Sequence, residues 1–200
     1  YLPYRPKRRT RATQARARGL EPLAERMWAQ GDRGGDVVSI AAAYVDPARE
    51  VPDVEAALQG ARDIVAERIA ETAAWRAELR AFTWERGTLR CQAARGKAEV
   101  RSKFEDYYDF ESGLTDLPGH RILAIRRGES EGFLRYRIGC DPELARGMLR
   151  RRAATSSDSP WRRHVEVAAE DAWDRLLSAQ IETELRLELK DRADAGAVEV

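Results

Sequence analysis

Residues 53–86 read DVEAALQGARDIVAERIAETAAWRAELRAFTWER and carry the longest helical pattern in the chain. Apolar side chains recur there at steps of three or four, from Val54 and Leu58 as far as Phe82, the spacing that lines one face of a helix. Asp53 can cap the first turn and Gly87 can end the last one. We therefore predict a single helix of roughly 50 Å, whose apolar stripe requires other helices packed against it.

The bulk composition suits a globular chain of one large domain or two small ones. Hydrophobic residues make up 43% of the 200 residues and charged residues 34%, so a core can form. The sequence has no run of eighteen apolar residues and no signal peptide, so we expect a cytoplasmic protein. Cys91 and Cys140 are isolated, which argues against a disulfide framework or a zinc site.

The ends of the sequence lead us to expect a piece of a longer protein. It begins at Tyr1 rather than at methionine, and it ends within a segment of helical character. Within it we predict a basic arm over residues 1–20 and a helical scaffold region over residues 21–200. A sub-boundary is expected at the polar linker near 153–159.

The remaining secondary structure is predicted to be mostly helical. Further helices are expected over residues 11–18, 22–30, 37–45 (buried), 96–108, 141–152 and 160–195, the last with a bend near Ser178. Residues 88–94 and 120–125 suit either helix or strand, and residues 109–118 suit a loop.

Alternation in Phe133–Ile138 is the one convincing strand signal. This strand either pairs with residues 120–126 as a hairpin or joins a sheet elsewhere in a longer protein. The predicted fold class is therefore mainly α: a multi-helix bundle organised on one long helix, with at most one short strand or hairpin near 120–138.

Charge is distributed unevenly along the chain. Seven of the 35 basic residues and none of the 34 acidic ones lie in the first twenty positions, which leaves net charge −6 on the rest. Such an arm would attract phosphate groups and release their counterions. The predicted nucleic-acid-binding residues are Arg5, Lys7, Arg8, Arg9, Arg11, Arg16 and Arg18. Alternatively, they pair with the acidic body or with the rest of a longer protein. The basic run Arg146–Arg152 could extend the surface.

No catalytic residue, metal site or cofactor site is indicated. His120 and His164 have no partner at a metal-ligand spacing, and neither cysteine lies in a nucleophile motif. An acidic group at 106–111 is better explained as a solvated loop than as a metal site. We therefore expect a protein that is not an enzyme.

Three long motifs, in order, resemble the bacterial Tex transcription accessory proteins. They are YLPYRPKRRTRATQARARGLEPLAERMW at 1–28, VPDVEAALQGARDIVAERIAE at 51–71, and KFEDYYDFESGLTDLPGHRILAIRRGESEGFL at 103–134. The resemblance covers essentially the whole chain. Gly119 departs from it where serine is usual, and so does the Ser112–Gly113 pair where Glu-Pro is usual.

The resemblance implies a larger protein in which RNase-H-like, helix-hairpin-helix and C-terminal OB-fold RNA-binding domains follow this region. Nucleic-acid affinity in the family is attributed mainly to the OB-fold end. The 200 residues would then be a non-enzymatic helical scaffold that adds a secondary basic surface for RNA or DNA. The alternative is a docking module that contacts the remaining domains or RNA polymerase and has no nucleic-acid contact of its own.

Overall fold

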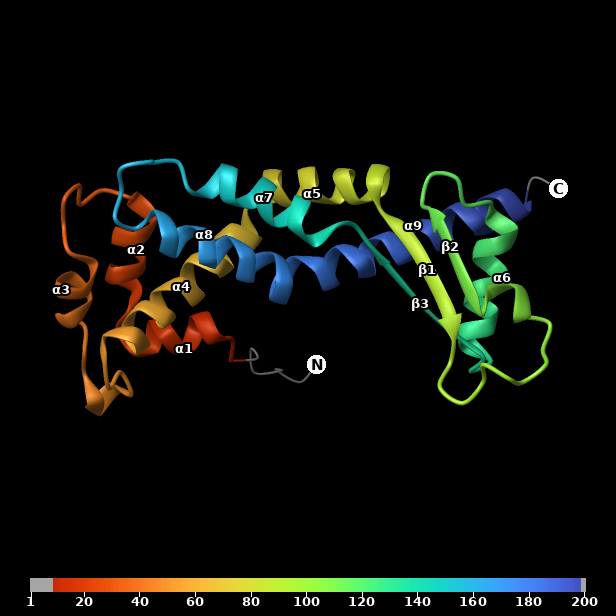
Figure 1. The fold of residues 1–200 in the computed structure, drawn as a ribbon, viewed down its shortest axis with the longest axis horizontal. Helices are drawn as coiled ribbons and strands as arrows, with labels where there is room; N and C mark the ends of the chain where they lie inside the picture. The colour runs from red at the N-terminus through yellow and green to blue at the C-terminus, as the bar shows by residue number, and fades with distance from the viewer. Residues whose placement is uncertain (1–8, 199–200) are drawn as a thin grey trace, which may run out of the picture. The chain divides into compact units, whose positions relative to one another are not determined.

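The computed structural model describes residues 9–198, with side chains as far as Ala195, and it is mainly helical (Figure 1). These residues form two compact units. Unit 1 comprises the described residues of Tyr1–Trp75 and Arg146–Leu176, and unit 2 those of Arg76–Ala145 and Leu177–Val200. The predicted arm boundary at residue 20 and the sub-boundary near 153–159 stay predictions.

In unit 1, helices gather around α4 (Figure 1). Residues on most of the circumference of α4 are buried, among them Ala57, Ile64 and Ile69. The contacts of α4 are with α1, α2, α3 and α8. The helices are α1 (Arg11–Ala17), α2 (Glu21–Ala29), α3 (Val37–Ala42), α4 (Val54–Glu71) and α8 (Arg162–Asp171), with a 3-10 turn η1 (Pro47–Arg49) before α4.

The predicted long helix is wrong in one respect, because it is broken at Thr72. The break separates α4 from α5 (Ala73–Arg86). Thr72 is extended, with φ −70° and ψ 101°, and its hydroxyl donates to the Arg68 carbonyl at 2.9 Å. Threonine bonded back in this way competes with the helical ladder and bends helices. The Thr72 carbonyl then accepts from Trp75 N at 3.1 Å and starts the next helix.

Unit 2 contains a three-stranded antiparallel sheet in the order β2-β1-β3 (Figure 1). The strands are β1 (Thr88–Ala93), β2 (Asp109–Gly113) and β3 (Leu134–Gly139). Helices α6 (Gly119–Ser130) and α9 (Ser178–Val198) contact each other and β3. The inner face of the sheet buries Leu89, Cys91 and the apolar residues of β3, whereas the outer face is exposed.

The prediction of at most one strand or hairpin is also wrong. Alternation in β3 is confirmed, with Leu134, Tyr136 and Ile138 buried. Its partner, however, is β1, and residues 120–126 lie in α6. The predicted loop at 109–118 contains β2, and the predicted helix at 96–108 is a turn followed by the 3-10 helix η2 (Glu105–Tyr107). Gly96 has φ +75°, which suits a turn and not a helix.

Three further elements refine the predictions. Helix α3 is not buried: Val38 is 57% exposed and only Ala41 is buried in it. Helix α7 spans Pro142–Ala153. Residues Ala172–Leu177 form the π-helical segment η3 between α8 and α9, so the helical ladder is irregular directly before Ser178, where a bend is predicted.

Candidate nucleic-acid interface

The folded part of the basic arm is α1, which is fixed on α4 by small residues. Thr10 caps it by accepting from Thr13 N at 3.0 Å. Ala12 and Ala15 are each 2% exposed. The approach is close: a Cβ at Gly60 of α4 would lie 2.3 Å from Leu20 Cδ1 and 3.4 Å from Ala15 Cβ. One face of α1 is therefore core, and its other face carries the exposed polar residues.

The seven predicted residues divide into three groups. Arg5, Lys7 and Arg8 lie outside the described residues. Arg9 and Arg11 are exposed. Arg16 and Arg18 contact carboxylates of the folded body. The sequence left open whether the arm binds phosphate or the acidic body, and for phosphate binding all seven stay predictions.

Arg16 is held in a network of two carboxylates. Its Nη1 donates to Glu67 Oε1 at 2.6 Å and its Nε to Glu21 Oε2 at 2.7 Å. These partners, first the hydrogen bond to Glu67, raise the pKa of Arg16 above its usual value. The pair joins Arg16 of α1 to Glu67 of α4, and the Glu67 side chain is only 19% exposed. Arg16 therefore contributes more to the packing of α1 than to a free positive surface.

Arg18 lies in a more open setting, beside a hollow of about 590 Å³. Its Nη2 is 2.8 Å from Glu50 Oε2, but the Glu50 side chain is 78% exposed, so the pair is screened by water. The hollow is lined by Arg9, Thr13, Gln14, Ala17, Arg18, Ala48, Arg49 and Glu50. Three guanidinium groups thus face one carboxylate, and the geometry can accept an anion.

Arg49 of this hollow was missed by the sequence analysis. Asp46 accepts from Ala48 N at 3.1 Å and shapes the turn that brings Arg49 to α1. Arg49 lies about thirty positions after Arg18 in the sequence, and no local motif indicates that the two residues meet.

The run Arg146–Arg152 is partly neutralised. Arg146 binds Asp174 with its Nε and Nη2 at 3.0 and 2.9 Å, and Arg150 Nη1 binds Glu170 at 2.9 Å. Two guanidinium groups of this basic run therefore serve the packing of unit 1, and the run adds less charge to the surface than its sequence suggests.

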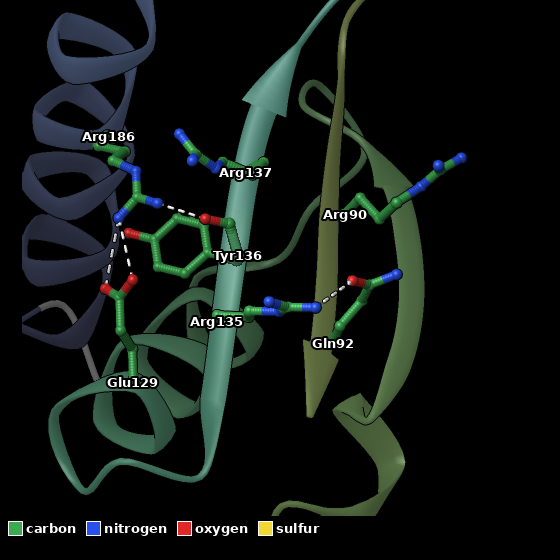
Figure 2. A pocket seen from close by; sticks show the side chains of 7 residues that line it. All are labelled: Arg90, Gln92, Glu129, Arg135, Tyr136, Arg137 and Arg186. Atoms are coloured by element: carbon green, nitrogen blue, oxygen red, sulfur yellow. Dashed lines mark hydrogen bonds and ion pairs between the residues drawn. The ribbon is translucent and has the colours of Figure 1, made fainter. Parts of the chain in front are cut away.

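A second basic group lies on the outer face of the sheet in unit 2 (Figure 2). Arg90 and Gln92 of β1 are directly opposite Arg137 and Arg135 of β3. Together with Glu129 of α6, Tyr136 of the inner face and Arg186 of α9 they line a hollow of about 490 Å³, which therefore reaches round the edge of β3. Alternation in Phe133–Ile138 implies that Arg135 and Arg137 share one side of the strand, but nothing in the sequence indicates that Arg90 lies beside them, because the pairing of β1 with β3 is a long-range contact.

The described residues contain no group of three or more His, Cys, Asp or Glu side chains able to hold a metal ion. Burial raises the pKa of the Cys91 thiol to about 11, which keeps it protonated. Burial also raises the pKa of Cys140. His164 has a pKa lowered by burial and by Arg62, whose Nη1 lies 3.1 Å from its Nδ1. In the same described part, no helix has the length and apolar character needed to cross a membrane.

Comparison with known proteins identifies the family. A family model described as "Tex central region-like" matches residues 32–200. "Protein tex" of Bordetella pertussis is 46% identical over 144 residues, which are 72% of this chain and 18% of that protein. "Protein YhgF" of Escherichia coli is 36% identical over the whole chain and 27% of its own length.

"Transcriptional accessory protein Tex" of Neisseria gonorrhoeae is 34% identical, again over the whole chain and 27% of its own length. The chain thus spans between 18% and 27% of the length of these three relatives. Motifs, family model and relatives agree, and the chain belongs to the Tex family.

Proposed function

We propose that these 200 residues are a non-enzymatic helical scaffold of a cytoplasmic, Tex-like transcription accessory protein, and that they contribute to its binding of RNA or DNA. The observation that carries the proposal is the arm, with seven basic and no acidic residues in twenty positions. Arginine and lysine at this density bind phosphate without reading base sequence. The name of the Neisseria gonorrhoeae relative, a transcriptional accessory protein, supports a role in transcription.

The basic residues of the arm do not contribute equally to phosphate binding in this proposal. Arg16 is engaged with Glu21 and Glu67 and would leave both carboxylates unpaired if it turned to phosphate. Arg9 and Arg18 line an open hollow with Arg49. We therefore assign the phosphate contacts first to the five basic residues up to Arg11, and then to Arg18 in exchange for Glu50.

The test replaces side chains and leaves the backbone intact. Deletion of residues 1–20 would remove Ala12, Ala15 and Leu20 from the core, so loss of binding after deletion would be ambiguous. The variant instead carries glutamine in place of Arg5, Lys7, Arg8, Arg9 and Arg11. The measurement is the anisotropy of a labelled, short oligouridine RNA, titrated with the 200-residue chain at several salt concentrations.

We expect the affinity at about 0.15 M salt to fall at least tenfold, and the slope of log K against log salt to become shallower by up to about 3.5. The matched control carries glutamine at five exposed arginines elsewhere: Arg33, Arg101, Arg121, Arg127 and Arg163. Its net charge is the same, so equal binding by both variants would refute the assignment to the arm.

A docking module without nucleic-acid contact is the second candidate. It is favoured by large apolar side chains on the surface: Val38 is 57% exposed, Leu144 55% and Leu187 57%. The partners would be the remaining domains of the longer protein or RNA polymerase. This candidate predicts no measurable RNA binding at about 0.15 M salt, together with capture of one of those partners.

A further inference from the structure

The outer face of the sheet in unit 2 gathers exposed arginines on two neighbouring strands. Arg90 of β1 and Arg137 of β3 are register partners, and like charges directly opposite each other destabilise a sheet. Both side chains are well exposed, Arg137 at 85% and Arg90 at 62%. The pair therefore adds positive charge to the surface and does not help to hold β1 and β3 together.

The two guanidinium groups turn away from each other and leave a space between them (Figure 2). Arg90 Nη2 lies 2.7 Å from Glu111 of β2, and Arg137 Nη1 lies 3.3 Å from Glu182 of α9. Arg135, two residues along β3 from Arg137, reaches across to β1 and is 3.4 Å from the neutral side chain of Gln92 (Figure 2). Four guanidinium groups and one carboxylate line the resulting hollow. The lining alone carries net charge +3, and with the paired carboxylates Glu111 and Glu182 the group carries +1.

One of these four arginines is structural. Arg186 of α9 binds Glu129 of α6 at 3.1 Å and donates to the backbone carbonyl of Tyr136 (Figure 2). The Arg186 side chain thereby covers the free edge of β3. Its guanidinium also lies over the Tyr136 ring, 3.9 Å from the centroid. The ligand-facing groups are therefore Arg90, Arg135 and Arg137, and Arg186 fixes the strand that presents two of them.

The basic surface extends beyond one hollow. A second hollow of about 430 Å³ shares Arg90 and Arg137 with the first, and its wall adds Arg86 and one carboxylate, Asp141. Along β3, Arg135 and Arg137 are two residues apart, or about 6.7 Å. An open row of cations on this scale suits a polyanion, which gains from the release of several counterions, better than it suits one isolated phosphate ion.

We propose that the row Arg86, Arg90, Arg137 and Arg135, here named the sheet arginine row, binds the sugar-phosphate backbone of a nucleic-acid strand. Guanidinium forks bind phosphate oxygens in pairs. The outer-face positions of β1 and β3 hold threonine, glutamine, glycine and arginine but no aromatic ring, so bases have nothing to stack on there. The contact is accordingly sequence-independent and sensitive to salt.

This inference deepens the proposed function and rests on it, because it gives the region a second phosphate-binding surface, separate from the arm. The test uses the whole 200-residue chain and the same labelled oligouridine. In the double variant Arg135→Gln/Arg137→Gln, two contacts are lost. We expect the affinity at about 0.15 M salt to fall about tenfold, and the salt slope to become shallower by about 1.4.

The matched control is Arg121→Gln/Arg127→Gln, which removes two exposed arginines of α6 and should bind within twofold of the parent chain. Arg137→Lys keeps the charge but loses the fork, so it should bind RNA more weakly than the parent chain and more tightly than Arg137→Gln. The melting temperature of every variant is recorded, and since all positions are exposed, the variants should remain folded.

The outcomes separate the two proposals. If the arm variant binds weakly and the sheet variant binds normally, the sheet arginine row is refuted and the arm stands. If the sheet variant alone binds weakly, the row is supported and the assignment to the arm fails. If the sheet variant and its control fall equally, only net charge matters and the row is refuted. One further result would overturn the row. In it, inorganic phosphate at constant ionic strength displaces the RNA from the parent chain, but the sheet variant binds the RNA with unchanged affinity.

Discussion

Substitution of Gly87 tests the junction between α5 and the sheet. Gly87 N donates to the Thr83 carbonyl at 2.8 Å and ends the helix, and β1 begins at the next residue. A Cβ at this position would lie 2.3 Å from the Thr83 carbonyl oxygen and 2.8 Å from that of Gly139. Both neighbours are backbone atoms, so they cannot rotate out of the way as a side chain could.

The expected cost of Gly87→Ala follows from these two contacts. Overpacking costs about 1–3 kcal/mol, and the rigid backbone neighbours place this site near the upper value. Alanine also restricts the unfolded chain, which offsets about 0.4–1 kcal/mol. The free energy of unfolding should therefore fall by about 2 kcal/mol, and Tm by about 4–8 °C for a chain of this size.

The assay is thermal unfolding followed by circular dichroism, with Gly139→Ala as the matched control. Among the described residues, no heavy atom outside the chain neighbours lies within 4 Å of a Cβ built at Gly139. Alanine there should therefore be neutral or slightly stabilising. If Gly87→Ala melts within a degree of the parent chain while Gly139→Ala behaves as expected, the close approach at the junction is wrong.

Three further outcomes are expected. Burial lowers the pKa of His164 in the folded chain, so near and below its usual pKa the unfolded chain binds more protons than the folded chain. The free energy of unfolding should therefore be full at neutral pH and decline as pH falls below about 6.5. His164→Gln should flatten this decline in a series of Tm measurements against pH. Arg16→Ala should lower the free energy of unfolding by about 1 kcal/mol, and a double-mutant cycle with Glu67→Ala should show coupling, whereas additivity would contradict the pair. Cys91, buried with a pKa of about 11, should resist a thiol reagent at pH 8 in the folded chain and react fully in denaturant; fast labelling before unfolding would contradict its burial.

Local signals in the sequence predicted the elements whose ends and faces are set by neighbours in the chain. Thr10 and Asp53 cap α1 and α4 as their side-chain chemistry indicates. The alternation of β3 matches its burial because one of its faces is core. Each of these features depends on hydrogen bonds or periodicity within about ten residues.

Features set by distant contacts could not be predicted in the same way. The apolar period continues through Thr72, so the pattern gives no sign of the break there. Strand β2 reads DFESG and has no buried residue and only one large apolar side chain, Phe110, so its sequence lacks the repeated apolar alternation of a half-buried strand. Arg49 and Arg90 join basic groups only through a turn and a strand register, neither of which is encoded beside them.

The same distinction separates the two basic surfaces. In the arm, charge is visible in the sequence, but folding uses part of it: Arg16 holds α1 on α4 through Glu67. On the sheet, the grouping of the charges is hidden in the sequence, because Arg90 and Arg137 become neighbours only through the pairing of β1 with β3. Each of the two also pairs with one carboxylate, Arg90 with Glu111 and Arg137 with Glu182, while their direct opposition is unfavourable. A strand of this exposure would be at least as stable with threonine at these positions. A bound phosphate would offset the repulsion between the opposed side chains, so RNA binding at the proposed sheet arginine row should raise the Tm of the folded chain, a gain that the Arg135→Gln/Arg137→Gln variant loses.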